Sequence, residues 1–165
     1  MKVFYEFITP FLKGKKLLDI GCGSGRDIGF FLQKGFKVAG VDAAAEFLKI
    51  CKMKYPKLKF YSSKIQKLNI PEKNFDVISI IAVWMHLKKG EYQNTIKSIK
   101  KYLKKNGVLI ISYSTGRREG FEYINYRFLK GLFIKKGFCL KAQKITADSM
   151  NRNIKWITQI YVKIT

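Results

Sequence analysis

The residues best suited to binding chemistry lie in a glycine-rich turn near the start of the chain. The apolar run 17–20 (LLDI) leads into residues 21–25 (GCGSG). Such a turn between a strand and a helix lets backbone approach a ligand closely and presents unpaired N–H groups to an anionic partner. Its G-x-G-x-G spacing, with Arg26 next, departs from the G-x-G-x-x-G dinucleotide fingerprint, and no Gly-Lys-Ser/Thr follows as in a P-loop. The spacing therefore argues against both of those nucleotide sites.

A carboxylate occupies the matching place after the next apolar run. Asp42 directly follows the stretch 36–41 and stands 21 residues after Gly21, where a carboxylate can accept both hydroxyls of a ribose. Taken singly, the glycines fit a tight structural turn and Asp42 fits a helix N-cap. Together they favour a nucleoside-like ligand.

The rest of the chain alternates between two patterns. Residues 75–83 are almost all apolar and often β-branched, as in a strand buried on both faces. The predicted strands are 17–20, 36–41, 58–61, 75–83, 108–114, 138–145 and 154–163. The predicted helices are 26–34, 43–54, 93–105 and one ending near residue 137, after a short N-terminal helix within 1–12. This alternation predicts an α/β fold with a Rossmann-like, doubly wound, mainly parallel sheet and helices on both faces, in a single domain 1–165 without a separate substrate domain. Ligands are expected at the carboxyl ends of the strands.

These features resemble the class I S-adenosylmethionine-dependent methyltransferases. The motifs are LLDIGCGSG, VAGVD, FDVISIIAVWMHL and LKKNGVLIIS, and the resemblance, to a small bacterial member, covers essentially the whole chain. It implies a seven-stranded sheet whose last strand is antiparallel, and S-adenosyl-L-methionine as the cofactor.

The resemblance also implies which residues bind the cofactor. The turn would lie against its methionine part, Asp19 would help to place the amino end, Asp42 would hold the ribose and Ala43 would border the adenine. Arg26 could reach the amino acid end or pair locally with Asp27. The implied cofactor set is Asp19, Gly21, Cys22, Gly23, Gly25, Arg26, Asp42, Ala43, Lys64, Ile65 and Ala82.

One position departs from the family pattern. Many members carry an acidic residue after the third strand to accept the adenine amino group, and Lys64 stands there. A lysine ammonium has no acceptor. We therefore expect backbone near Lys64 and Ile65, or the side chain of Ser63 or Gln66, to read the adenine edge.

Methyl transfer from a sulfonium depends mainly on orientation, and a base is needed only if the nucleophile arrives protonated. His86, the one histidine, is the candidate catalytic base, unless it is a surface or capping residue. Trp84 and Tyr113 are candidates for the substrate pocket, and each fits a core position equally. Arg117, beside Arg118, could grip a carboxylate or phosphate, or belong to a solvated pair.

Substrate class is argued mainly from missing motifs. Strand 75–83 lacks the Pro-Pro-aromatic signature of amino-group nucleic-acid methylation, and no cysteine follows a proline as in C5 methylation of pyrimidines. We therefore expect transfer to an O, N or S atom of a small molecule. The alternatives are RNA or protein methylation, and a non-catalytic cofactor-binding module. The expected helical lid is minimal, and such an open site could mean a bulky substrate, a partner subunit or second copy (a homo-oligomer) acting as the lid, or an inactive copy.

The charge is the extreme feature of the composition. The chain has 33 Lys and Arg, 28 of them Lys, against 11 Asp and Glu, a net charge of +22. Such charge suits a polyanion, but an A/T-biased coding sequence would give many lysines whatever the function, and the lysines are scattered and not clustered on one face. Nucleic acid is thus the less favoured partner.

Other counts exclude further classes. Three cysteines and one histidine predict neither a disulfide framework nor a metal site. The longest apolar run, 77–85, is too short to cross a membrane, and the first residues do not read as a secretory signal. We expect a cytoplasmic protein without a membrane partner.

Overall fold

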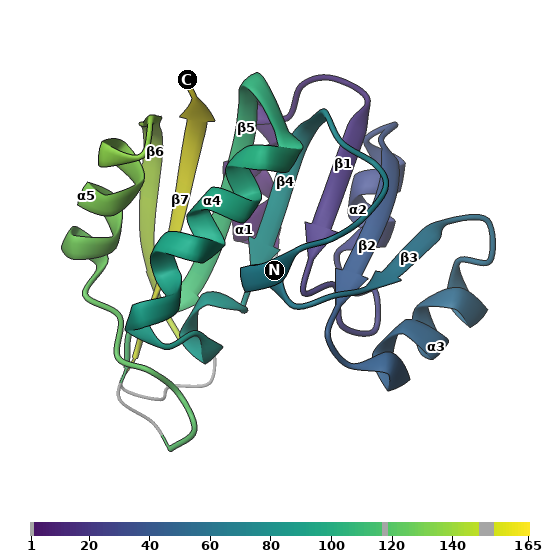
Figure 1. Cartoon of the computed structure of the whole chain (residues 1–165), viewed down its shortest axis with the longest axis horizontal. Helices are drawn as coiled ribbons and strands as arrows, with labels where there is room; N and C mark the ends of the chain where they lie inside the picture. Colours follow the sequence, from purple (N-terminus) through teal and green to yellow (C-terminus); the bar gives the residue numbers. More distant parts are fainter. Residues whose placement is uncertain (1, 117–118, 149–153) are drawn as a thin grey trace.

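In the computed structural model, which describes residues 2–116, 119–148 and 154–165, seven strands form one sheet (Figure 1). The strands are β1 (Lys16–Ile20), β2 (Lys37–Asp42), β3 (Lys59–Ser62), β4 (Phe75–Ile81), β5 (Leu103–Ser114), β6 (Phe138–Ala147) and β7 (Lys155–Lys163). Their order is β3-β2-β1-β4-β5-β7-β6. The first five pair in parallel, and β7 runs antiparallel to β5 and β6. The predicted seven-stranded sheet with an antiparallel last strand is confirmed.

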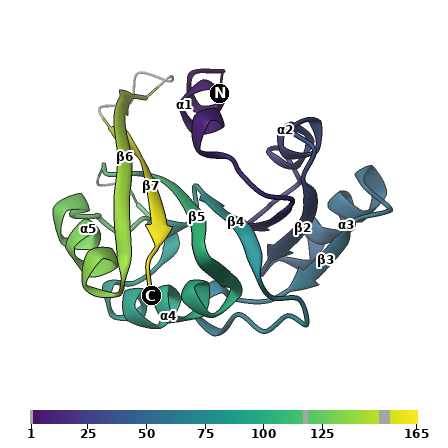
Figure 2. The same cartoon turned by 90° about the horizontal axis from the view of Figure 1, so that it is seen from above.

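Helices cover both faces of this sheet. They are α1 (Lys2–Ile8), α2 (Ile28–Gln33), α3 (Ala45–Lys54), α4 (Tyr92–Tyr102) and α5 (Tyr126–Lys135). Short 3-10 helices are η1 (Thr9–Phe11), η2 (Ile65–Lys67), η3 (Trp84–His86) and η4 (Lys89–Glu91). Figure 2 shows α4 and α5 on one face, and α1 and α2 on the other. Within the described ranges, no helix has both the length and the apolar character needed to span a bilayer.

The two central strands explain the continuous apolar runs in the sequence. On β1, Leu17 packs in the cluster beneath α1 and α2, while Leu18 packs in the cluster beneath α4 and α5. On β4, Val77 and Ile78 divide in the same way. Since successive side chains of a strand point to opposite faces, a strand covered on both sides must be apolar at every position.

One predicted boundary is wrong. The sequence favoured a helix up to Lys105, but α4 ends before Leu103, where β5 begins. Leu103 pairs with Phe75 on β4, and Lys104 Nζ lies 2.6 Å from a carboxylate oxygen of Asp76. Strand pairing and this ion pair therefore override the helical periodicity, which continues through the segment.

Candidate functional site

The glycine-rich turn after β1 is tied to the end of β2. The N–H groups of Gly21 and Cys22 both donate to the carbonyl oxygen of Val41, at 2.7 and 3.0 Å. Gly21 and Gly23 have left-handed backbone, with φ of 72° and 52°. A Cβ on Gly21 would collide with the side chain of Val83, whereas one on Gly23 would meet no atom within 4 Å. Glycine at 21 is thus needed for packing, and Gly23 leaves bare backbone facing open space.

Asp42 is held between this turn and the start of α3. Its Oδ2 accepts the N–H of Gly23 at 2.8 Å, and its Oδ1 accepts the N–H of Ala44 at 2.9 Å. An ionised carboxylate has about four lone-pair sites, so each oxygen keeps acceptor capacity. The two backbone bonds fix the orientation of a half-buried carboxylate that can still bind hydroxyl groups.

A pocket of about 600 Å³ opens beside the turn and is called the larger pocket below. Most of the expected cofactor residues line it: Gly21, Cys22, Gly23, Arg26, Asp42, Ala43, Lys64, Ile65 and Ala82. Phe47 of α3 and Leu87 also line it, and the sequence analysis missed both. The signal for Phe47 is its place in the first turn of α3, the helix that follows Asp42.

Two members of the expected cofactor set lie behind this wall. Asp19 and Gly25 do not line the larger pocket. Asp19 is 2% exposed and accepts the hydroxyl of Ser79 at 2.6 Å. Burial raises the pKa of Asp19 to about 7, although the Ser79 hydrogen bond opposes the rise. Asp19 thus binds β4 directly, and contact with a cofactor amino group stays a prediction.

Arg26 pairs locally, which was one of the two alternatives for it. Its Nη2 lies 2.8 Å from Oδ2 of Asp27. The Tyr5 hydroxyl donates to the other oxygen of Asp27 at 2.6 Å, and the Tyr5 ring stacks on Phe30 with centroids 4.1 Å apart. Burial, with Asp27 close by, raises the pKa of Tyr5, so its hydroxyl stays a donor. These contacts dock α1 onto the start of α2.

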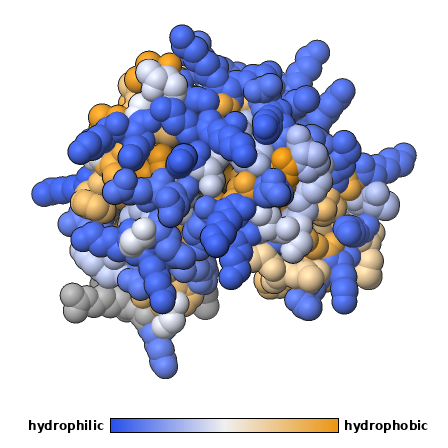
Figure 3. Space-filling view, in the orientation of Figure 1, coloured by the Kyte–Doolittle hydropathy of each residue, from blue (hydrophilic) through white to orange (hydrophobic). Residues whose placement is uncertain are grey.

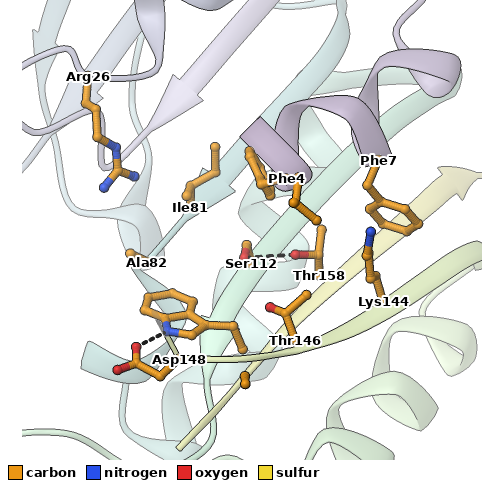
Figure 4. A pocket seen from close by; sticks show the side chains of 13 residues that line it. Phe4, Phe7, Arg26, Ile81, Ala82, Ser112, Lys144, Thr146, Asp148 and Thr158 are labelled. Atoms are coloured by element: carbon orange, nitrogen blue, oxygen red, sulfur yellow. Dashed lines mark hydrogen bonds between the residues drawn. The ribbon is translucent and has the colours of Figure 1, made fainter. Parts of the chain in front are cut away.

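A second cavity, called the smaller pocket, has a volume of about 450 Å³ (Figure 4). It lies between α1, the carboxyl ends of β4 and β5, and the strands β6 and β7. Arg26, Ile81 and Ala82 line both pockets, so the two cavities adjoin. The sequence analysis did not identify this cavity as a site.

Ala82 stands where the two pockets meet. It has φ of 60°, a left-handed conformation that is uncommon for a residue with a Cβ. Its N–H donates to the carbonyl oxygen of Ser112 at 2.8 Å, which holds the end of β4 against β5. The strand predicted for 75–83 therefore stops at Ile81. Strained backbone held in this way is often found at functional sites.

The proposed substrate residues need correction. Trp84 and Tyr113 are both completely buried and line neither pocket. The Trp84 ring packs against Tyr92 and Phe133, and the Tyr113 hydroxyl donates to Gln159 at 3.1 Å. Both belong to the core cluster that also contains the buried residues of α4 and α5. Arg117 and Arg118 lie outside the described residues.

His86 lies in η3, at the rim of the larger pocket. Its side chain is exposed, and its ring lies against Phe121 with centroids 4.9 Å apart. His86 does not line the smaller pocket. This position suits contact with the occupant of the larger pocket more than a base role in the smaller one, and the base role stays a prediction.

Comparison with known proteins finds matches to the sequence and to the fold of this chain. A family model described as a methyltransferase domain matches residues 18–111. A ubiquinone biosynthesis O-methyltransferase of Pelagibacter ubique is 36% identical over 104 residues, which are 61% of this chain and 42% of that protein. An uncharacterized protein of Haemophilus influenzae is 33% identical over 114 residues, 64% of this chain and 44% of that protein. The chain thus spans less than half the length of these curated relatives.

A solved structure extends the likeness beyond the matched residues. A SAM-dependent methyltransferase from Methanosarcina mazei superposes with a TM-score of 0.84 at 18% identity, covering 97% of this chain and 98% of that one. At this identity the likeness concerns the fold, including β6, β7 and the helices around them.

Proposed function

The chain belongs to the methyltransferase domain family, the class I S-adenosylmethionine-dependent methyltransferases, and from this membership we propose that it transfers a methyl group to an O, N or S atom of a small molecule. The observation that carries the proposal is the pair of adjoining pockets that share Arg26, Ile81 and Ala82. The larger pocket takes the cofactor and the smaller pocket takes the acceptor. Both volumes fall in the range usual for small-molecule sites, about 300 to 1,000 Å³.

The residues of the larger pocket fit S-adenosylmethionine. Asp42 offers oriented carboxylate oxygens to the ribose hydroxyls, since its two backbone bonds leave acceptor sites. The bare backbone at Gly23 leaves room for the methionine part. Phe47 and Ala43 supply apolar surface for the adenine ring.

The adenine edge has its own candidate acceptor. Residues 63–66 line the larger pocket, and the Lys64 ammonium has no acceptor. The Nε2 group of Gln66 donates a hydrogen bond to Glu91 at 3.0 Å, and this bond does not use the side-chain carbonyl oxygen of Gln66. Ser63 Oγ already accepts the N–H of Asn69 at 3.2 Å. We therefore favour the Gln66 carbonyl oxygen as the partner of the adenine amino group.

The protein's share of the chemistry is mainly orientation. When bound, S-adenosylmethionine supplies a methyl group on a positively charged sulfur; the lone pair of an acceptor atom attacks the methyl carbon, and the sulfur is the leaving group. The shared wall at Ile81 and Ala82 places the two pockets so that acceptor and methyl group can meet. Holding reactants in this way can contribute about 7 to 11 kcal/mol to lowering the barrier.

Two side chains are candidates for taking a proton from the acceptor. His86 lines the larger pocket and is exposed. Asp148 lines the smaller pocket, where its Oδ1 accepts the indole N–H of Trp156 at 2.9 Å. A base must come within hydrogen-bond reach of the proton it removes. Asp148 meets the geometric condition better, because it faces the pocket proposed for the acceptor.

One observation favours RNA as the alternative acceptor, namely the net charge of +22. Figure 3 shows hydrophilic side chains spread across the viewed face, without a single stripe. A nucleic-acid footprint is usually clustered along one face or groove. The cavity next to the shared wall is the more specific feature, so the small molecule remains the first choice.

The test follows the methyl group. Purified protein is incubated with S-adenosylmethionine labelled in its methyl group and with separated small-molecule, RNA and protein fractions of a cell extract. We expect label in the small-molecule fraction. Label confined to RNA or protein would reverse the choice of acceptor, and no transfer together with no binding of the cofactor would refute the proposal.

A pair of glycine variants controls for folding. Gly23 and Gly35 both have left-handed backbone, with φ of 52° and 82°, and an added Cβ meets no atom within 4 Å at either. Gly23→Val and Gly35→Val therefore impose similar backbone strain. Only Gly23 lines the larger pocket, so only Gly23→Val should abolish labelling.

A further inference from the structure

Lys144 brings a positive charge into the smaller pocket. It lies on β6, is half buried, and its Nζ sits 5.7 Å from the centroid of the Phe7 ring. The ion pairs found in the described part of the chain use Arg26, Lys59 and Lys104. Within that part, no carboxylate lies within ion-pair distance of Lys144.

The other charged groups of this pocket are already engaged. The Arg26 guanidinium pairs with Asp27, and the Asp148 carboxylate accepts the indole N–H of Trp156. Among the described charged side chains that line this pocket, Lys144 is thus the one without a hydrogen bond or ion pair to a polar group. A half-buried ammonium gains most from a negatively charged ligand, because water screens it less than at an open surface.

The body of the pocket suits a flat apolar molecule. Aromatic rings of Phe4, Phe7 and Trp156 line it, together with the aliphatic side chain of Ile81. Two hydroxyl groups of the pocket, those of Ser112 and Thr158, already hydrogen bond to each other at 3.0 Å.

The ends of the pocket differ in chemistry. Figure 4 shows Lys144 and Phe7 at one end, and Arg26 and Ala82 at the other. Ala82 also lines the larger pocket, so its end is where an acceptor would meet the methyl group. A ligand bound through Lys144 would therefore direct its opposite end toward the transfer.

The anionic group that fits Lys144 is a carboxylate. One ammonium faces it, and Thr146, two residues along β6 and so on the same face, adds one hydroxyl. Phosphate groups in proteins typically meet several donors, such as an Arg fork or a helix N-terminus. The Arg26 fork is at the far end and is held by Asp27.

We propose that the methyl acceptor is an aromatic, or similarly flat, carboxylic acid whose carboxylate binds Lys144 and whose reacting atom lies beside Ala82. This rests on the proposed function, because it takes the smaller pocket as the acceptor site. With a phenolic hydroxyl as the reacting group, an oxygen–carbon bond forms as the carbon–sulfur bond breaks. The bonding pair stays on sulfur, which becomes a neutral thioether, and the hydroxyl proton passes to solvent or to Asp148. The carboxylate itself takes no part in the transfer.

The test compares an acid with its neutral amide. The probes are 4-hydroxycinnamate and 4-hydroxycinnamide, and their dissociation constants are measured by calorimetry with and without S-adenosylhomocysteine. We expect the acid to bind wild type about fivefold or more tightly than the amide, with the preference shrinking at high salt. Lys144→Met should remove the preference. Lys141→Met, an exposed position on the same strand outside the pocket, should retain it.

Several results would overturn the inference. These are equal affinities for acid and amide in wild type, a preference that survives in Lys144→Met, and no measurable binding of either probe. Tighter binding of 4-hydroxyphenyl phosphate than of the acid would refute the choice of carboxylate. Binding of S-adenosylhomocysteine is measured separately. If the protein does not bind it but still prefers the acid over the amide, the proposed methyl transfer is refuted and the anion site at Lys144 is not.

Discussion

Replacing Asp42 by alanine tests the cofactor site most directly. The substitution removes both oriented oxygens and leaves the N–H groups of Gly23 and Ala44 without their present partners. Losing a hydrogen bond to a charged group costs about 1.5 to 3 kcal/mol, which is roughly 10- to 150-fold in dissociation constant. Asp42→Asn keeps one carbonyl oxygen, so its loss of affinity should fall between wild type and Asp42→Ala.

The assay is calorimetric titration with S-adenosylhomocysteine, alongside thermal unfolding of each variant. Asp76 provides a matched control. Its Oδ2 also accepts two backbone N–H groups, those of Lys15 and Lys16, at 2.8 and 2.9 Å, but it lies at the opposite end of the strands. Asp76→Ala should lower stability and leave affinity unchanged. Wild-type affinity in Asp42→Ala, or equal weakening in both variants, would refute the ribose assignment.

Three other predictions use the same protein. Because burial raises the pKa of Asp19 to about 7, its contribution to stability is full below about pH 4 and is lost as the pH rises through 7. Between about pH 5 and 8, the free energy of unfolding of Asp19→Asn, measured with denaturant, should therefore fall less than that of wild type, by up to about 3 kcal/mol. Equal pH dependence of the two proteins would contradict this. At Ala82, with φ of 60°, we expect Val to lower the free energy of unfolding by about 1 to 3 kcal/mol in urea and Gly to change it little; equal effects would argue against strain. Because His86 lines the larger pocket and not the smaller one, we favour Asp148 as the base and expect His86→Asn to keep turnover within about threefold; a fall of 10²-fold or more would instead identify His86 as the general base.

Local signals explain what the sequence could predict. The turn at Gly21 and Gly23 and the carboxylate of Asp42 are adjacent to strand ends, and their roles depend on short-range backbone geometry. The apolar runs through β1 and β4 required cover on both faces, which implies the layered sheet. The fold and most of the larger pocket follow from these patterns.

Non-local contacts explain what it could not. The smaller pocket joins Phe4, Ser112, Lys144 and Trp156, which become neighbours only after β7 inserts between β5 and β6. Each is unremarkable in its own segment. Trp84 failed as a candidate for the same reason, because the burial of its ring depends on α4 and α5, which come later in the chain.

On the proposed assignment of the two pockets, α1 bears on selection of the acceptor and not on binding of the cofactor. This helix forms one wall of the smaller pocket through Phe4 and Phe7 and contributes nothing to the larger one. It is docked by side chains, through Tyr5 on Asp27 and Phe30, and adds no strand to the sheet. On this assignment, substitutions of Phe4 and Phe7 would change the shape of the proposed acceptor pocket without replacing a residue that lines the proposed cofactor pocket. In evolutionary terms, new specificity can arise here by exchanging a few side chains on one peripheral helix.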